Sequence, residues 1–392
     1  PYGRQQIDDD DIDAVVSVLR GDWLTTGPAV EAFETTLARA VDARFAVACS
    51  SGTAALQMAA LACGVKGGDS VIVPTLTFLA TANAPHHAGA EVIFADVDPD
   101  NGLMTAQTFR EALAKAEDRR IKAVFPVHLN GQTCDLEAIA EIARQHDITV
   151  VHDAAHSLGG EYNGGKIGSD GAPHAFSFHP VKTVAMGEGG AVTTNDASLA
   201  QALRTVRNHG MTRESENFAN PALAFAADGQ VNPWYYEMPA PGFNFRVSDL
   251  NCALGVSQLA KLDRFVARRR ALVARYDALI GELAPVVAPV SRVEGCWPAW
   301  HLYVALIDFP ATSKDRAAVM RALKDRGIGT MVHYLPVHRQ PYYQKRYGEE
   351  SLPGAVRYYE RALSLPLFPD MRDDDVERVL TALAEVLGIR TG

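Results

Sequence analysis

Short apolar, β-branched runs alternate with amphipathic segments over the first two hundred residues, and this alternation constrains the fold more than any other feature. The predicted strands cover residues 44–50, 70–75, 91–97, 121–129, 149–152, 175–178 and 191–194. Helices are predicted between them, most clearly over 52–63 and 136–145. Strands and helices that alternate in this way build a largely parallel sheet covered by helices on both faces. The sequence therefore predicts an α/β fold.

The pattern changes after about residue 250, where strands become fewer. A long helical stretch is predicted over 250–280, a strand over 301–308, and helices over 317–326 and 374–387. We therefore expect a large domain over residues 1–250 and a smaller α+β domain over 251–392. Residues 213–242 are rich in Asn, Ala, Pro and Gly without periodicity. They predict a long connection, and loops of that length are often functional.

Charge and composition exclude several classes of protein. Lys and Arg number 37 against 47 Asp and Glu, so the net charge of −10 argues against a nucleic-acid partner. No apolar stretch approaches the roughly 18–20 residues of a membrane span, and the first residues lack the apolar core of a signal peptide. The five cysteines form no C-x-x-C pair. We expect a cytoplasmic enzyme that neither enters a membrane nor binds nucleic acid.

Two charged runs have structural interpretations. The acidic run at residues 8–11 precedes apolar residues at helical spacing, and acidic side chains are favourable in a helix's first turn. The run Arg268-Arg269-Arg270 could bind a diphosphate, but an arginine run on a long helix is usually solvent-exposed, and we favour that interpretation.

Lys182 lies in the most informative segment of the sequence. It is placed between two apolar strands and is followed by Gly187, Gly189 and Gly190. Glycines allow the backbone to turn tightly beside a ligand. Alone, a lysine in such a loop is usually a surface residue, so its interpretation depends on other segments.

Three other segments follow predicted strands and supply complementary chemistry. Ser51-Gly52-Thr53 opens a helix, where amide and hydroxyl groups can hold a phosphate. Asp153 follows the apolar strand at 149–151, which places a carboxylate where open α/β sheets bind ligands. Phe78 lies just beyond another strand. With Lys182 these residues form the set that pyridoxal phosphate needs: an imine-forming amine, a partner for the pyridine nitrogen, a stacking ring and a phosphate cradle.

An ordered set of motifs extends the argument over nearly the whole chain. The motifs are Tyr2-Gly3, LTTG at 24–27, SSGTAAL, DAAH, FSFHPVK, GEGG, GFNFRVSDLNCALG at 242–255 and VHYLP at 332–336. With them the chain resembles the nucleotide-sugar aminotransferases of fold type I. The resemblance implies a mostly parallel seven-stranded sheet between helices and a smaller α+β C-terminal domain. Within the family, HPVK followed by GEGG is most similar to the pseudaminic acid pathway enzymes.

The resemblance also implies roles for individual residues. Lys182 is the Schiff-base lysine and proton carrier, and Asp153 is the partner of the pyridine nitrogen. The residues implied to bind pyridoxal 5'-phosphate are Ser51, Gly52, Thr53, Phe78, Asp153, His156, Ser177, Lys182 and Asn244. Asn244 corresponds to an asparagine that reaches the phosphate of the neighbouring subunit, which implies a homodimer with shared sites. The residues implied to bind the nucleotide sugar are Tyr2, Leu24, Thr25, Ser51, His333 and Tyr334.

The resemblance implies transfer of an amino group, from L-glutamate, to C4 of a UDP-linked 2-acetamido-2,6-dideoxy-4-keto-hexose. Another nucleotide-linked 3- or 4-keto-6-deoxy sugar is an alternative substrate. A dehydratase of the same fold is expected to carry histidine in place of Lys182, and a ligand sensor is expected to carry a DNA-binding module. His152 and His156 have metal-ligand spacing only on a helix, and they follow a strand, so no metal site is predicted.

Overall fold

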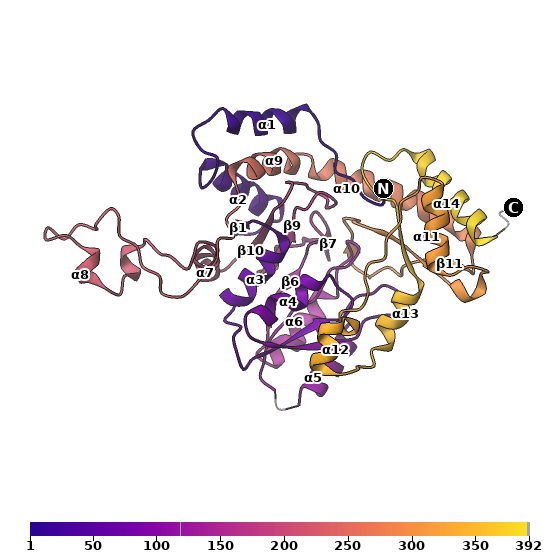
Figure 1. Ribbon diagram of the computed structural model, residues 1–392, viewed down its shortest axis with the longest axis horizontal. Helices are drawn as coiled ribbons and strands as arrows, with labels where there is room; N and C mark the ends of the chain where they lie inside the picture. The colour runs from indigo at the N-terminus through magenta and orange to yellow at the C-terminus, as the bar shows by residue number, and fades with distance from the viewer. Residues whose placement is uncertain (118, 390–392) are drawn as a thin grey trace.

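The computed structural model describes residues 1–117 and 119–389, and a single sheet runs through its centre (Figure 1). One group of paired strands has the order β1 (Phe45–Cys49), β10 (Gly190–Thr194), β9 (His174–Ser177) and β6 (His152–Asp153). The other has the order β3 (Glu91–Ala95), β2 (Ser70–Pro74), β4 (Ile121–Val124) and β5 (Thr149–Val150).

The two groups form one layer, because β5 and β6 are halves of a strand interrupted at Val151. The Val151 amide donates to the Val124 carbonyl at 3.0 Å, which keeps the strand in register. In the described part of the chain this layer has seven strands, all parallel except β10. The predicted α/β architecture and its mostly parallel seven-stranded sheet are confirmed.

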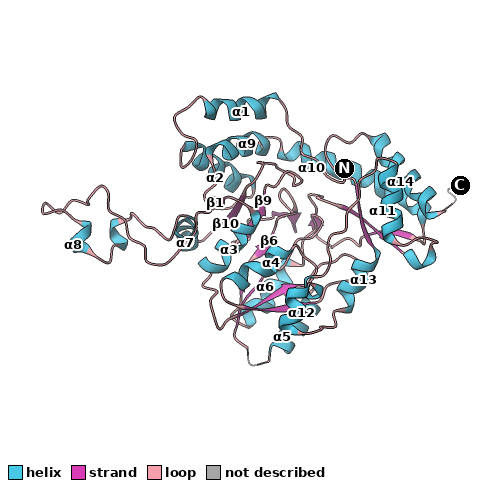
Figure 2. Cartoon of the chain, in the orientation of Figure 1, coloured by secondary structure: helices cyan, strands magenta, loops and turns pink. Residues whose placement is uncertain are grey.

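Both faces of the sheet are buried. In β2, Val71 and Val73 belong to one apolar cluster and Ile72 to another, and all three side chains are fully buried. Successive side chains of a strand point to opposite faces, so helices must cover both. Figure 2 shows the strands enclosed by helices. The helices of this part are α1 (Asp9–Leu19), α2 (Pro28–Ala40), α3 (Gly52–Ala62), α4 (Leu79–His87), α5 (Ala106–Ala116), α6 (Leu136–Gln145) and α7 (Ala197–Arg207).

The C-terminal part adds helices around a three-stranded sheet of order β11 (Val287–Pro289), β13 (Tyr303–Ile307) and β14 (Ala362–Leu365). Its helices are α9 (Asp249–Leu259), α10 (Leu262–Ile280), α11 (Arg316–Asp325), α12 (Pro341–Tyr347), α13 (Pro353–Arg361) and α14 (Asp373–Leu387). A further small sheet joins β7 (Glu161–Tyr162), β8 (Gly165–Lys166) and β12 (Cys296–Trp297). Short 3₁₀ turns cover Gly281–Leu283, Phe309–Ala311 and Val337–Arg339. The domain boundary at residue 250 stays a prediction.

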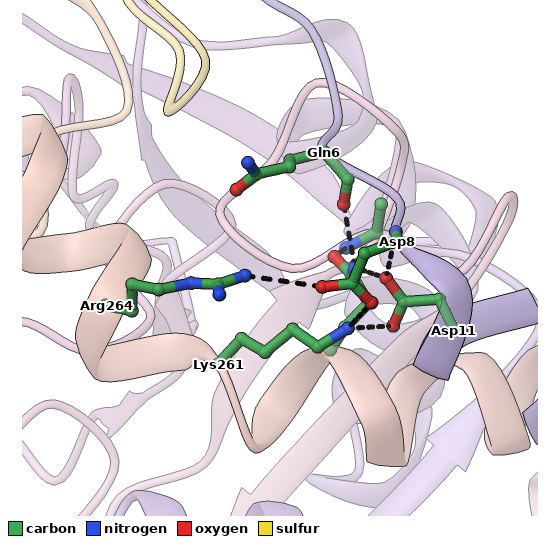
Figure 3. A network of polar contacts seen from close by, with 7 residues as sticks. Gln6, Asp8, Asp11, Lys261 and Arg264 are labelled. Carbon is green, nitrogen blue, oxygen red and sulfur yellow. Dashed lines mark hydrogen bonds and ion pairs between the residues drawn. The ribbon is translucent and has the colours of Figure 1, made fainter.

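The long helix expected over 250–280 is two helices, because Lys261 leaves helical geometry at φ −105° and ψ 2°. Figure 3 shows that its amine contacts Asp8 and Asp11, at 2.9 Å from Asp11. Gln258 donates to Asp11 at 2.7 Å and to the Gln6 carbonyl at 2.9 Å. The acidic run does begin a helix, as predicted, and the buried Asp11 also ties the N-terminal segment to α9 and α10.

The prediction of a solvent-exposed arginine run is wrong for Arg269, which is only 1% exposed. Its Nη1 donates to the carbonyls of Leu367 at 2.9 Å and His301 at 3.2 Å. Burial lowers the pKa of this guanidinium to about 10. The middle arginine faces inward because α10 packs on the C-terminal sheet, which is a tertiary contact that a charge pattern cannot reveal.

Residues 212–237 form an arm that extends away from the rest of the molecule (Figure 1). It contains only a 3₁₀ turn at Ser215–Asn217 and the short helix α8 (Pro221–Ala224), which agrees with the predicted connection. The Glu237 carboxylate accepts from the amides of Ala219 at 2.7 Å and Asn220 at 2.8 Å, so the arm has internal order. Among the described residues, no helix combines the length and the apolar composition that a bilayer crossing requires.

Candidate active site

A cavity of about 650 Å³ opens where β1, β2, β6 and β9 end. Ligand sites of open α/β sheets form at such strand ends because the carboxyl ends of parallel strands meet at one edge. Its wall contains eleven of the residues predicted from the sequence: Tyr2, Ser51, Gly52, Thr53, Phe78, Asp153, His156, Ser177, Lys182, His333 and Tyr334.

The N-terminus of α3 forms one end of the cavity. Ser51 caps this helix, with its Oγ accepting from the Ala54 amide at 3.1 Å. Within the described residues, the amides of Gly52 and Thr53 donate no hydrogen bond. A Cβ at Gly52 would lie 2.7 Å from the Ser177 Cβ, so only glycine allows this close approach. Free amides at a helix N-terminus bind phosphate.

Asp153 lies in the wall of the cavity at the end of β6. It is 5% exposed, and Thr81 Oγ1 donates to its Oδ2 at 2.6 Å while the Ala155 amide donates to its Oδ1 at 3.1 Å. Burial raises the pKa of this carboxyl, and the two donors and the Lys182 charge oppose that rise. A buried carboxylate of this kind is favourable when a cationic N–H faces it.

Lys182 lies in the loop between β9 and β10, which pair as an antiparallel hairpin. Its amide donates to the His179 carbonyl at 2.8 Å, and the Met186 amide donates to the Phe178 carbonyl at 2.8 Å. These bonds close the loop and direct the lysine to the cavity wall. Burial lowers the pKa of the Lys182 amine to about 8, although Asp153 acts in the opposite direction.

This pKa predicts how the lysine reacts with an aldehyde. A primary amine attacks a carbonyl only in its neutral form, which becomes the major form of Lys182 above about pH 8. The rate at which cofactor-free protein is labelled by pyridoxal phosphate and borohydride should therefore rise with pH through a midpoint near pH 8 and level off about one pH unit higher. A midpoint near the usual lysine value would contradict the burial of this amine. Lys182→Ala protein gives the background labelling of other lysines.

His301 is a wall residue that the sequence did not reveal. It is 3% exposed, and its ring centroid lies 4.3 Å from that of His156. Tyr334 Oη lies 3.2 Å from His156 Nε2, while His156 Nδ1 is buried without a partner in the described chain. Burial lowers the pKa of both histidines, so they are neutral. His301 carries no motif, because the C-terminal part brings it to the cavity from 145 residues beyond His156.

Phe78 is 55% exposed and lies just before α4, with its ring 6.0 Å from that of Tyr334. It is therefore available to stack on a planar ligand in the cavity.

Leu24, Thr25 and Asn244 do not line this cavity. The Leu24 carbonyl accepts from the Asp249 amide at 3.0 Å, and Thr25 pairs with Ser248. Asn244 is exposed and pairs with Asn208. All three residues are exposed and lie outside the cavity wall, and their binding roles stay predictions.

Three buried histidines lie behind Asp153. His128, His152 and His174 have nitrogen atoms within 4.8 Å of one another. The rings of His152 and His174 stack 4.3 Å apart at 20°, and those of His128 and His152 lie 5.0 Å apart at 24°. Lone pairs in nearly parallel rings do not converge on one point, and burial lowers all three pKa values. The cluster is a stack of neutral rings, and His152 points away from His156.

The cavity fits pyridoxal 5'-phosphate by the chemistry of its wall. Gly52 and Thr53 present free amides to a phosphate, Asp153 needs a cationic N–H, and Phe78 offers a ring face. The unpaired His156 Nδ1 needs a polar partner, and Lys182 offers an amine of lowered pKa.

Comparisons with known proteins agree with this chemistry. Residues 5–384 match the model of the DegT/DnrJ/EryC1/StrS aminotransferase family. The chain is 41% identical over 390 residues to the spore coat polysaccharide biosynthesis protein SpsC of Bacillus subtilis, covering 99% of this chain and 97% of that protein.

Two solved structures extend the likeness. Helicobacter pylori PseC, an aminotransferase involved in the biosynthesis of pseudoaminic acid, matches with a TM-score of 0.87 and 27% identity over 99% of both chains. The PLP form of Spr1654 of Streptococcus pneumoniae matches with a TM-score of 0.87 and 27% identity over 99% of this chain and 98% of that one. The chain therefore belongs to the DegT/DnrJ/EryC1/StrS family and is a pyridoxal-phosphate-dependent sugar aminotransferase.

Proposed function

We propose that this aminotransferase transfers an amino group from L-glutamate to C4 of a UDP-linked 2-acetamido-2,6-dideoxy-4-keto-hexose in the cytoplasm. The observation that carries the proposal is the single cavity in which Lys182, Asp153 and the α3 N-terminus meet, in a chain that resembles PseC over its whole length. The likeness to SpsC, a spore coat polysaccharide biosynthesis protein, favours a substrate that is used to build a surface polysaccharide. Another nucleotide-linked 3- or 4-keto-6-deoxy sugar is the alternative substrate.

When bound, pyridoxal phosphate supplies a carbonyl that accepts the donor's amine and a ring that withdraws electrons. Lys182 would hold the cofactor by its Nζ and, once released, carry a proton between the substrate carbon and the carbonyl carbon of the cofactor. Asp153, held by Thr81 and Ala155, would keep the ring nitrogen protonated. The free amides of Gly52 and Thr53 would fix the phosphate, so that the ring cannot shift while the proton moves.

The sugar would enter between the cofactor and the C-terminal part of the wall. His333 Nδ1 lies 2.8 Å from Ser364 Oγ, and its ring lies 5.3 Å from the Tyr2 ring. Tyr334 lies on the same side, against His156. These neutral polar groups suit sugar hydroxyl and acetamido groups, which bind by hydrogen bonds rather than by charge.

A panel of nucleotide keto sugars tests this proposal. We expect L-glutamate to bleach the visible absorption band of the bound cofactor, and the UDP-linked 4-keto sugar to restore it with release of an amino sugar seen by mass spectrometry. Restoration by a 3-keto sugar alone would replace the proposed substrate with the alternative. If glutamate leaves the band unchanged while another amino acid bleaches it, the proposed donor is wrong.

We also propose a homodimer in which Asn244 of one subunit binds the cofactor phosphate of the other. Asn244 is exposed beside its own cavity rather than in it, as such a role requires. A Lys182→Ala chain mixed with an Asn244→Asp chain should then regain part of the activity, because one site of the heterodimer holds an intact lysine and an intact asparagine. An aspartate facing a phosphate is strongly unfavourable, which inactivates the second parent.

Tagged pull-down must first show that heterodimers form. Confirmed heterodimers without recovered transamination would contradict the proposed contact between Asn244 and the phosphate of the other subunit. Asn244 would then be a turn residue, which is a common role for asparagine beside glycine.

A further inference from the structure

Arg269 is a buried cation whose hydrogen bonds end on backbone carbonyls of the C-terminal part. It lies on α10 and is only 1% exposed. Its Nη1 donates to the carbonyls of Leu367 at 2.9 Å and His301 at 3.2 Å. Among residues 1–117 and 119–389, no carboxylate lies within 4 Å of this guanidinium. A buried cation without a counter-ion is costly, so an apolar side chain would suit the core at this position better.

The two carbonyls belong to segments that build the wall of the cavity. His301 is itself a wall residue. The Leu367 amide donates to the carbonyl of Tyr2 at 2.9 Å, and Tyr2 is another wall residue. One nitrogen atom of Arg269 therefore joins two wall segments that are far apart in the sequence.

His301 is held on both sides of its backbone. Its amide donates to the Asn130 carbonyl at 2.9 Å, while its carbonyl accepts from Arg269. Within the described residues its ring forms no hydrogen bond, and its Nδ1 is buried without a partner. Burial, and then the neighbouring His156 and Lys182, lower the pKa of His301. The ring is therefore neutral and close to Lys182, and a neutral imidazole can donate or accept a hydrogen bond.

We propose that Arg269 positions His301 so that the His301 ring binds the sugar of the nucleotide-linked substrate, an assignment that rests on the proposed function. The carbon that receives the amino group must reach the cofactor held by Lys182. The sugar, rather than the nucleotide, therefore occupies the part of the cavity that His301 shares with Lys182. His301 contacts the sugar, and Arg269 acts through His301 without touching the substrate.

Arg270 provides the matched control. It is the next residue of α10, and it also donates to backbone carbonyls, those of Pro298 at 2.8 Å and Trp297 at 2.9 Å. Neither Pro298 nor Trp297 lines the cavity. Arg270→Met therefore removes the same kind of bond from the segment before His301 without freeing a wall residue.

Calorimetric titration of the holoenzyme with UDP and with UDP-N-acetylglucosamine tests the proposal. The second probe carries a 2-acetamido sugar but no keto group, so it binds without reacting. We expect Arg269→Met to weaken binding of the UDP-sugar about tenfold and binding of UDP by less than about twofold, because His301 contacts only the sugar. Arg269→Lys keeps the cation and can still donate to a carbonyl, so its loss should be smaller. The Arg270 variant should bind both probes as the wild type does.

A double-mutant cycle separates positioning from a general loss of structure. In protein that already carries His301→Ala, Arg269→Met should cause no further loss of UDP-sugar affinity, because the group through which Arg269 acts is absent. Melting temperatures show whether each variant folds, and Arg269→Lys takes the place of an Arg269→Met chain that does not. The same loss in both backgrounds, equal losses for UDP and the UDP-sugar, or wild-type affinity in the Arg269→Met variant would overturn the proposal.

The outcome is distinguishable from failure of the proposed function. If the wild type aminates only a different nucleotide-linked keto sugar, the proposed substrate is wrong, and the KM of the accepted sugar decides the role of Arg269 in the same cycle. If the wild type aminates the UDP-linked 4-keto sugar and both Arg269 variants keep its KM, only the role of Arg269 is lost.

Discussion

Replacing Lys182 with alanine should reduce transamination by about four orders of magnitude, because the change removes both the amine that holds the cofactor and the group that moves the proton. The residue lies in the wall of the cavity. Its amine has a pKa of about 8, so part of the amine is neutral at physiological pH. The rate of the half-reaction with L-glutamate, followed by the cofactor's absorption, measures the loss.

The fold of this variant should remain intact, since alanine removes a desolvated amine and leaves the hairpin bonds of residues 178–186 in place. Lys166→Ala is a suitable control, because Lys166 is exposed and its amine forms only a long ion pair, with Asp42 at 3.4 Å, among residues 1–117 and 119–389. Near-native turnover by the Lys182 variant, without added amine, would remove this lysine from the mechanism.

Replacing Asp153 with asparagine should lower the rate of the same half-reaction by about two to three orders of magnitude, with a much smaller effect on cofactor affinity. Asparagine keeps the size of the side chain and can still accept from one of its donors, Thr81 or Ala155. It carries no charge, so it cannot hold a ring nitrogen in its protonated form, and the ring withdraws electrons less strongly.

Asp170→Asn is the matched control for this prediction. Asp170 is a half-exposed aspartate that faces His152 and His174, on the side of the strand away from the cavity. Its replacement should change the rate less than twofold. Equal rates for the wild type and the Asp153 variant would show that another group sets the protonation of the ring nitrogen.

The residues that the sequence predicted best are those that follow buried strands. Asp153, Phe78 and Ser51 each come directly after an apolar run, and the parallel sheet brings such positions to one edge. Local pattern and fold class were therefore enough to place them together. Lys182 follows the same logic, since the loop between two adjacent strands returns to that edge.

Other features depend on contacts between distant segments, which no local pattern encodes. His301 reaches the cavity because the C-terminal part packs against the sheet, and Arg269 is buried by the same packing. The break between α9 and α10 lies at Lys261, which pairs with Asp8 and Asp11 some 250 residues earlier. The positions of Leu24 and Asn244 outside the cavity likewise required the structure, because their predicted roles came from resemblance alone.

The antiparallel pairing of β1 with β10 determines when β1 can pair during translation. Residues 45–49 pair with residues 190–194, so about 140 to 150 residues must be added before β1 finds its partner. At roughly 5–20 residues per second, translation leaves this apolar strand unpaired for about 7 to 30 s. An unpaired strand edge is a template for pairing with other chains. The hairpin that carries Lys182 therefore also supplies the strand whose pairing with β1 ends this interval.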